Sequence, residues 1–211
     1  MTELERNALL PAGLRDVLPN DAAFEAEMVE RLVAFLAARG YDRVKPPLIE
    51  FEDGLLSGAG VAVAPQTFRL MDPVSQRMMG LRADITPQIA RIAGSRLALA
   101  PRPLRLSYAG EVLRVRGSQL RPERQIVQVG AELIGSAAPT ADAEIIVMAV
   151  EAPGHDGGDT CLVHTVHNRG SRCGHNNCRS CFLRMRRSYP GSTGKRSQQY
   201  RPLRIQRLQA T

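Results

Sequence analysis

Apolar side chains recur every three to four residues between positions 21 and 39, which is the spacing of one face of an α-helix. The run ends at Gly40, a residue type that commonly follows the last turn of a helix. The pattern therefore predicts an amphipathic helix over residues 21–39. Its buried face is expected to consist of Phe24, Met28, Leu32, Phe35 and Leu36.

Shorter segments with strand character follow this helix. Residues 41–44 and 48–51 are expected to be extended. The sequences TFRLM and QRMMGLR are joined across a turn that contains Pro73, which predicts a β-hairpin over residues 67–82. LRLSYA and EVLRV, on either side of Gly110, predict another strand region.

Two further helices are expected. Thr86 followed by Pro87 is a favourable helix start, with threonine as the N-cap and proline in the first turn. Residues 141–152 form the second helix, with Thr140 as its cap. Strands in hairpins with helices outside them are typical of an α+β fold built on a sheet.

Residues 125–133 are predicted to be a strand with two different faces. By the two-residue period of a strand, one face is apolar and suits a core: Val127, Val129, Ala131 and Leu133. The opposite face carries Ile126, Gln128, Gly130 and Glu132. There an amide and a carboxylate flank a glycine, which leaves space above the sheet. This face is therefore either a pocket for a small polar ligand or the solvated side of an antiparallel strand.

Arg82, Asp84 and Thr86 lie on one side of the chain if their segment is extended. Asp84 precedes the expected helix, and a negative charge there interacts favourably with the positive end of the helix dipole. Two interpretations of this segment remain. Asp84 and Thr86 either stabilise the helix start and do no more, or Asp84 holds the ammonium group of an amino acid.

These segments resemble the amino-acid pocket of histidyl-tRNA synthetases. LRADIT is similar to the LRPE-x-T motif of that family, with Asp84 in place of the usual glutamate, and RQIVQVGAE resembles the strand that lines the histidine pocket. LRVR stands where class II synthetases carry the phenylalanine-arginine-x-glutamate core of motif 2. Arg114 matches the phosphate-binding arginine of that motif, and Arg116 replaces the glutamate. The resemblance implies a histidine-like ligand site formed by Asp84, Thr86, Arg114, Gln128 and Glu132.

The resemblance runs in order over residues 8–152. PAGLRDVLP, residues 11–19, resembles the entry segment of the family. RGYDRVKPPLIE, residues 39–50, resembles motif 1, which forms the dimer interface of class II synthetases. The resemblance implies an incomplete class II synthetase-like domain over residues 1–152, with an antiparallel sheet flanked by helices. It also implies self-association through the motif 1 region.

Within this superfamily, LRADITPQIARIA and GAELIG are most similar to the ATP phosphoribosyltransferase regulatory subunit of histidine biosynthesis. The resemblance implies a non-catalytic subunit of a hetero-oligomer, with no catalytic residues, cofactor or metal ligands. Its partner would be the short-form catalytic subunit, which joins ATP to phosphoribosyl pyrophosphate.

The alternative is a histidyl-tRNA synthetase-like fragment that activates histidine with ATP. Arg116 discriminates between the two, because a carboxylate at this position helps to place ATP and its magnesium, whereas a guanidinium cannot ligate a cation. The sequence also contains neither a glycine-rich motif 3 ending in arginine nor a leucine-aspartate-tyrosine-tyrosine type run. These features favour the regulatory subunit.

The composition changes after residue 152. Residues 1–152 contain 17 basic and 19 acidic side chains, whereas residues 153–211 contain 11 basic and 2 acidic ones. All four cysteines and all four histidines also lie in this second part. The formal charge of +7 therefore arises from a tail, which is expected to be disordered or irregular and not to be a native domain.

Three interpretations of residues 153–211 remain open. Cys173, His175, Cys178 and Cys181 are suitable zinc ligands, although their spacing is cramped. A disordered basic arm would instead bind RNA or phosphates through its charge. The third interpretation, which we favour, is an out-of-frame translation, because GC-rich codons read in a shifted frame give Arg, Ser, Gly, Pro, Cys and His without periodicity.

No targeting or membrane segment is expected. Glu3 and Glu5 interrupt the N-terminal segment, and the apolar residues 145–150 are too few to cross a bilayer. The chain is therefore expected to be cytoplasmic, and its domain is not expected to bind a membrane or nucleic acid.

Overall fold

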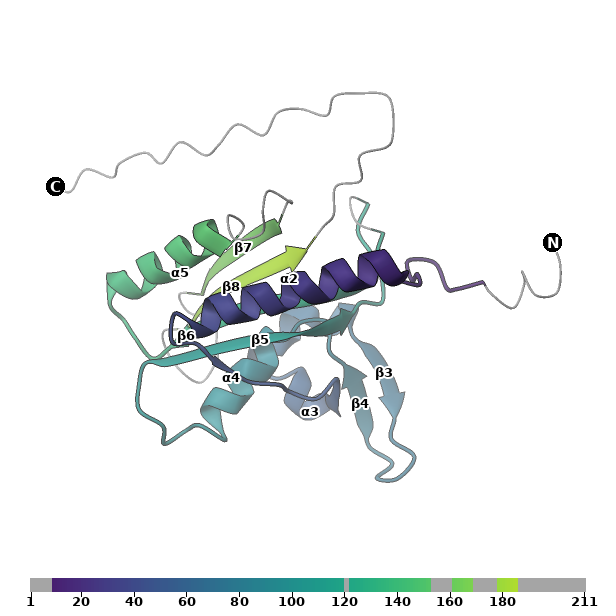
Figure 1. Cartoon of the computed structure of the whole chain (residues 1–211). Coiled ribbons are helices and arrows are strands. Elements are labelled where there is room, and N and C mark those ends of the chain that lie inside the picture. The colour runs from purple at the N-terminus through teal and green to yellow at the C-terminus, as the bar shows by residue number, and fades with distance from the viewer. Residues whose placement is uncertain (1–8, 120–121, 153–160, 169–177, 186–211) are drawn as a thin grey trace.

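The computed structural model describes residues 9–119 and 122–152, and the backbone of residues 161–168 and 178–185 (Figure 1). Its strands form a five-stranded sheet in the order β1-β5-β6-β8-β7 and a three-stranded sheet in the order β2-β4-β3. The large sheet consists of β1 (Asp42–Arg43), β5 (Leu104–Leu113), β6 (Gln125–Ile134), β8 (Cys178–Met185) and β7 (Cys161–Asn168). The small sheet consists of β2 (Ile49–Phe51), β4 (Met78–Leu81) and β3 (Phe68–Met71). The helices are α2 (Pro19–Ala37), α3 (Glu52–Leu55), the 3₁₀ segment η1 (Gly58–Gln66), α4 (Thr86–Gly94) and α5 (Pro139–Glu151).

The centre of the large sheet is the antiparallel pair β5–β6. Ten residue pairs join these strands, from Leu104 opposite Ile134 to Leu113 opposite Gln125. Strand β1 pairs in parallel with β5, and β8 pairs antiparallel with the other edge of β6. The predicted α+β fold, an antiparallel sheet flanked by helices, is confirmed.

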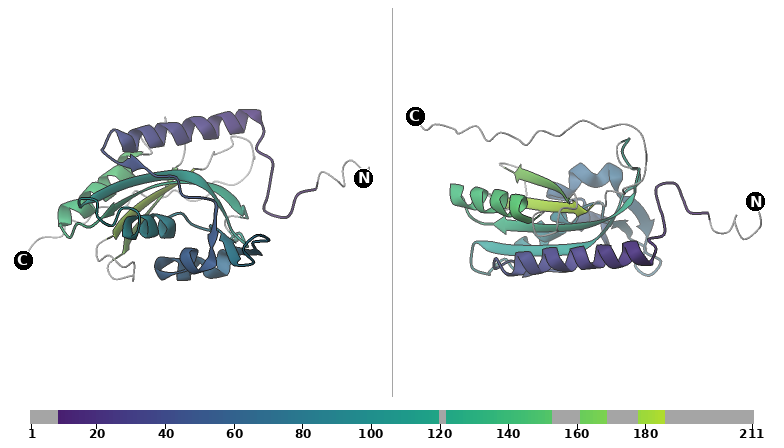
Figure 2. Two further views of the ribbon diagram at one scale, coloured as in Figure 1. Left: turned by 90° about the horizontal axis from the view of Figure 1, so that it is seen from below. Right: turned by 45° about the horizontal axis from the view of Figure 1, so that its top comes forward.

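Helices α2 and α5 cover one face of this sheet (Figure 2). The apolar face predicted for residues 125–133 packs against them, since Val129, Ala131 and Leu133 are buried and Val127 is partly buried. From the helices, buried side chains meet this face every three to four residues, which confirms the amphipathic pattern of the first helix. They include Leu32, Phe35, Leu36, Ile145 and Met148.

Helix α4 covers the opposite face of the sheet (Figure 2). Ile85, at the start of this helix, and Ile89 pack with Leu106 and Tyr108 of β5 in a second apolar cluster. Residues 128–134 of β6 are all buried. The interpretation of this strand as half-solvated is therefore wrong, because a helix lies where water was expected.

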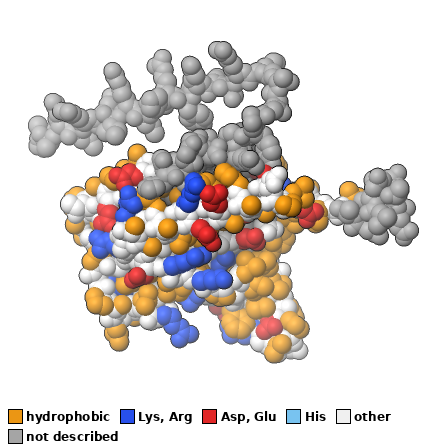
Figure 3. Space-filling view, viewed as in Figure 1, with side chains coloured by type: hydrophobic (Ala, Val, Ile, Leu, Met, Phe, Trp, Pro, Cys, Tyr) orange, Lys and Arg blue, Asp and Glu red, His pale blue; other side chains and the backbone are white. Residues whose placement is uncertain are grey.

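The predicted hairpin over residues 67–82 is confirmed as β3 and β4. Asp72 closes its turn, since the carboxylate accepts backbone N–H bonds from Val74 and Ser75, each at 3.1 Å. The hydrogen bond from the Ser75 hydroxyl, followed by these backbone bonds, lowers the pKa of Asp72. Hydrophobic side chains gather on the surface over this hairpin, and Met71 and Val74 are exposed (Figure 3).

Threonine does not cap either predicted helix. Helix α4 begins at Thr86 behind Ile85, helix α5 begins at Pro139 behind Ala138, and neither has a side-chain cap bond. The hydroxyl of Thr86 has a partner elsewhere, because it lies 3.1 Å from the hydroxyl of Tyr108. A tertiary contact has therefore replaced the local one that the sequence suggested.

The large sheet continues into the region that was expected to be an irregular tail. The backbone of residues 161–168 and 178–185 forms the antiparallel pair β7–β8, and β8 lies along β6. Valine and threonine in residues 161–168 suit a strand, and the edge of β6 offers unpaired backbone groups. The other tail residues, with Cys173 and His175, lie outside the described residues. No helix in the described part of the chain is long and apolar enough to cross a bilayer.

Candidate functional site

Gln128 joins the start of helix α4 to the centre of the sheet. Its amide nitrogen donates to the Asp84 carboxylate at 3.2 Å, and its amide oxygen accepts the backbone N–H of Ile85 at 3.1 Å. The side chain is 1% exposed, so both ends of a buried amide are satisfied within the protein. This geometry holds Asp84 at a fixed place beside strand β6.

At the start of helix α4, the side chain that accepts a backbone N–H is that of Asp84 and not that of Thr86. The Asp84 oxygen that receives the Gln128 bond also accepts the backbone N–H of Thr86 at 2.9 Å. A carboxylate at this end of α4 interacts favourably with the positive end of the helix dipole. Asp84 is only partly buried, so it remains within reach of a cationic group that approaches from outside.

Tyr108 connects the remaining two predicted residues. Its hydroxyl lies 3.1 Å from the Thr86 hydroxyl and donates to the Glu132 carboxylate at 3.3 Å. Tyr108 and Glu132 are fully buried. Burial, followed by the negative charges of Glu132 and Asp84, raises the pKa of Tyr108 well above its usual value. Tyr108 therefore keeps its proton and can act as a hydrogen-bond donor.

The space above Gly130 is filled by Tyr108. The two residues lie opposite each other in the β5–β6 ladder. A Cβ atom at Gly130 would lie 2.5 Å from Cζ and 2.8 Å from Cε2 of the Tyr108 ring. The prediction that this glycine leaves room for a ligand is therefore wrong, and the accessible part of the site lies towards Asp84 and Thr86.

Sequence reasoning missed Tyr108. The available signal was the pairing of LRLSYAG with QVGAEL, which places a tyrosine opposite a glycine. The faces of β6 followed from the strand period alone, whereas Tyr108 could be found only after this register was known.

Arg114 lies beside the segment that carries Asp84. Its Nε atom is 3.4 Å from the backbone oxygen of Ala83, and its own backbone N–H donates to Arg124 at 2.8 Å. Arg114 is half-buried, whereas Arg116 is exposed. The structure thus brings together four of the five predicted residues in one hydrogen-bonded network and places Arg114 next to it.

Arg82 has a structural role. It is 7% exposed, and its guanidinium donates to the backbone oxygens of Glu111 at 2.8 Å and Pro46 at 3.0 Å. Its backbone N–H donates to Leu48 at 3.1 Å. Burial lowers the pKa of Arg82, which the nearby carboxylates of Glu111 and Glu50 oppose. Arg82 therefore attaches the segment that resembles motif 1 to strand β5.

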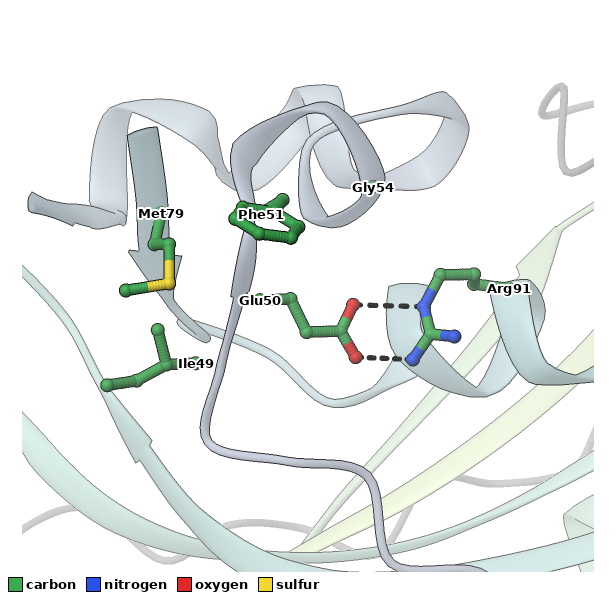
Figure 4. A pocket seen from close by; sticks show the side chains of 6 residues that line it. All are labelled: Ile49, Glu50, Phe51, Gly54, Met79 and Arg91. Atoms are coloured by element: carbon green, nitrogen blue, oxygen red, sulfur yellow. Dashed lines mark hydrogen bonds and ion pairs between the residues drawn. The ribbon is translucent and has the colours of Figure 1, made fainter. Parts of the chain in front are cut away.

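A separate pocket of about 320 Å³ lies at the small sheet (Figure 4). Glu50 and Arg91 form a two-bond ion pair in its wall, with Arg91 Nε donating to one Glu50 oxygen at 2.9 Å. The charges of Glu50 and Arg91 neutralise each other, and the pocket presents a mainly apolar surface. Its other lining residues are Ile49, Phe51, Gly54 and Met79.

The large sheet is antiparallel except for a short edge strand, it has helices on both faces, and it carries a polar network beneath the start of α4. This arrangement is that of a class II aminoacyl-tRNA synthetase-like protein. Two solved structures share this architecture. An ATP phosphoribosyltransferase regulatory subunit/histidyl-tRNA synthetase from Bacillus halodurans aligns with a TM-score of 0.62 and 29% identity, over 75% of this chain and 41% of that one. A histidine–tRNA ligase subunit from Alicyclobacillus acidocaldarius aligns with a TM-score of 0.63 and 30% identity, over 77% of this chain and 46% of that one.

The chain belongs to the histidyl-tRNA synthetase family, whose model matches residues 13–162. Among curated relatives, the ATP phosphoribosyltransferase regulatory subunit of Paramagnetospirillum magneticum is 67% identical over 152 residues, 72% of this chain and 40% of the relative. The protein of the same name from Rhodospirillum rubrum is 69% identical over 145 residues. These residues make up 69% of this chain and 38% of the relative. The predicted resemblance to regulatory subunits is confirmed, and the chain spans about two fifths of the length of these relatives.

Proposed function

We propose that this chain acts as a non-catalytic regulatory subunit of ATP phosphoribosyltransferase in the first step of histidine biosynthesis, in the cytoplasm. Its identity of 67% and 69% to two proteins of that name is the observation that carries the proposal. The alternative is a fragment that activates histidine with ATP. The exposed Arg116 disfavours this alternative, because a cation stands where class II synthetases use a carboxylate near ATP and its magnesium.

Histidine-dependent ATP–pyrophosphate exchange distinguishes the two functions. We expect no exchange above background from the 211-residue chain. Arg116→Glu, which restores the carboxylate, is the informative variant, because exchange gained only with this substitution would identify Arg116 as a cause of inactivity. Exchange by the unmodified chain that Arg114→Ala abolishes would overturn the regulatory proposal in favour of the fragment.

We also propose a ligand for the polar network. Asp84, which is partly buried, would pair with the ammonium group of histidine, while Gln128 holds the Asp84 carboxylate in place. Glu132 would accept an imidazole N–H from the interior. Thr86 and Arg114 complete the surroundings of a small zwitterion.

Calorimetry with L-histidine tests this site. A buried charge-assisted hydrogen bond contributes about 1.5–3 kcal/mol, so Glu132→Ala should weaken binding roughly ten- to a hundredfold. Glu144→Ala is the matched control, since Glu144 also accepts a tyrosine hydroxyl but belongs to the opposite face of the sheet. If Glu132→Ala lowers thermal stability and leaves histidine affinity unchanged, Glu132 is structural and the ligand assignment is wrong.

The partner proposed for this subunit is a short-form ATP phosphoribosyltransferase. Co-purification with that enzyme from a mixture of purified proteins is the direct test. A full-length relative such as the R. rubrum protein serves as the comparison, because this chain spans 38% of its length. Binding of the relative to an unrelated enzyme, with none to the transferase, would refute the assignment.

Self-association through the region around Arg43–Ile49 is a further part of the proposal. Leu48 is 43% exposed there, and Met78 of the neighbouring hairpin is 42% exposed. Burial of such side chains favours association by about 25 cal/mol per Å² of apolar surface. Leu48→Glu should therefore shift the chain towards monomer in analytical ultracentrifugation, whereas the exposed Val150→Glu on helix α5 should not.

A further inference from the structure

Helix α5 is apolar on two sides. Its inner side packs against the large sheet through residues that include Ile145 and Met148. Its outer side carries Ile146, Val147 and Val150, which are 52%, 50% and 73% exposed. Residues three and four apart are neighbours on a helix, so these three side chains form one outer strip. A helix that is apolar all round is normally buried all round. Helix α5 therefore has the sequence of a helix that is covered on both sides.

The outer strip distinguishes α5 from the other long helices. Among the described residues, α2 and α4 expose no large hydrophobic side chain, whereas α5 exposes three. The acidic side chains of α5 are held by partners on other elements. Arg105 donates to Glu144 at 2.8 Å, and Arg39 donates to Glu151 at 2.7 Å. The strip itself offers aliphatic contact only, so its occupant must also be apolar.

The size of the strip indicates what kind of occupant it fits. Helix α5 has 13 residues, which makes it about 20 Å long and about 10 Å wide. One side of such a helix presents about 200 Å². A stable contact between separate chains buries about 800 Å² on each partner, so the strip is too small to hold a second copy by itself. It is large enough for one segment of the same folded body, because that contact does not cost the entropy of association.

The relatives contain the body that this chain lacks. Helix α5 lies within residues 13–162, which match the family model, so it belongs to the part that the family shares. The matches cover 40% and 38% of the two curated relatives, and about three fifths of each relative has no counterpart in this chain. We propose that the outer strip of α5 is the docking surface for an apolar segment from that missing part. This assignment rests on family membership and not on the proposed ligand.

The experiment compares the 211-residue chain with a full-length chimera. The chimera is the P. magneticum relative in which the matching 152 residues are replaced by those of this chain. Ile146→Asp and Val150→Asp are made in both proteins. Each should lower the Tm of the chimera by about 5 °C or more, because the charge is then buried against an apolar segment. In the 211-residue chain each should change the Tm by less than about 2 °C, as expected of a surface substitution.

Leu99→Asp is the matched control, since Leu99 is fully exposed and lies outside α5. It should leave the Tm of both proteins unchanged. Equal effects of Ile146→Asp and Val150→Asp in the chain and in the chimera would overturn the inference, because the strip would then face solvent in the full-length body. If Val150→Asp abolishes self-association of the 211-residue chain, the occupant is a second copy and the inference is also overturned.

A second measurement decides the question if the chimera does not fold. Hydroxyl-radical footprinting oxidises side chains according to their exposure, and it can be applied to the unmodified chain and the unmodified P. magneticum relative. Ile146, Val147 and Val150 should be oxidised in this chain, and the matching positions of the relative should be protected several-fold. Equal oxidation of the two helices would overturn the inference.

Discussion

Gly130→Ala is expected to destabilise the chain, because the added methyl group must share its space with Tyr108. The new Cβ would lie 2.5 Å from Cζ of a ring that is fully buried. Overpacking of this kind costs about 1–3 kcal/mol. A displaced ring also weakens the hydroxyl's bonds to Thr86 and Glu132, each worth about 0.5–1.5 kcal/mol. Alanine recovers about 0.5–1 kcal/mol of backbone entropy relative to glycine. The expected net loss is therefore about 2–3 kcal/mol.

Equilibrium urea unfolding, followed by circular dichroism, measures this loss as a lower midpoint at an unchanged slope. Gly54→Ala is the matched control, since the nearest atom to its new Cβ is Arg91 Cδ at 3.8 Å, an ordinary contact. The control should be as stable as the unmodified chain or more stable, because Gly54 lies in helix α3. Equal stability of Gly130→Ala and Gly54→Ala would show that Tyr108 does not occupy the space above Gly130.

The remaining predictions concern two other groups. Arg82→Lys should lower the free energy of unfolding by about 1–3 kcal/mol, because an ammonium cannot reach the carbonyls of Pro46 and Glu111 together; an unchanged urea midpoint would contradict this. A bidentate pair with Arg105 lowers the pKa of Glu144 in the folded chain, so its stabilising effect is present above the unfolded pKa and is lost as pH falls through the folded one. Glu144→Gln should therefore lose less stability than the unmodified chain between pH 7 and pH 3, as measured by urea unfolding at each pH.

The faces of strand β6 could be predicted because the strand period is a local property. Val129 and Leu133 enter the core with α2 and α5, as the alternation indicated. The residues that bury the other face of β6 could not be predicted in this way. They depend on which strand pairs with β6 and in which register. Tyr108 reaches Gly130 only through the pairing of β5 with β6. The candidate residues were therefore found from a resemblance, and their connection was found from tertiary structure.

The start of helix α4 shows a second limit of local reasoning. Thr86 has the chemistry of an N-cap, but its hydroxyl can bond either to the helix or to a distant group. Tyr108 supplies that distant group, and the Asp84 carboxylate accepts the Thr86 backbone N–H instead. Similarly, the valine and threonine content of residues 161–168 suits a strand, but only the edge of the large sheet gives such a segment a partner.

The bonds made by Arg82 have a consequence for how the chain opens. Its side chain and backbone join residues 46–48 to strand β5, and the Gln88 amide donates to the Pro47 oxygen at 2.8 Å from helix α4. Strand β2 follows this segment directly, so the small sheet cannot separate from the large one without exposing a buried guanidinium. Regions connected in this way open as one cooperative unit. The amides of β2 and β5 should therefore exchange with solvent deuterium through the same opening event, although the two strands belong to different sheets.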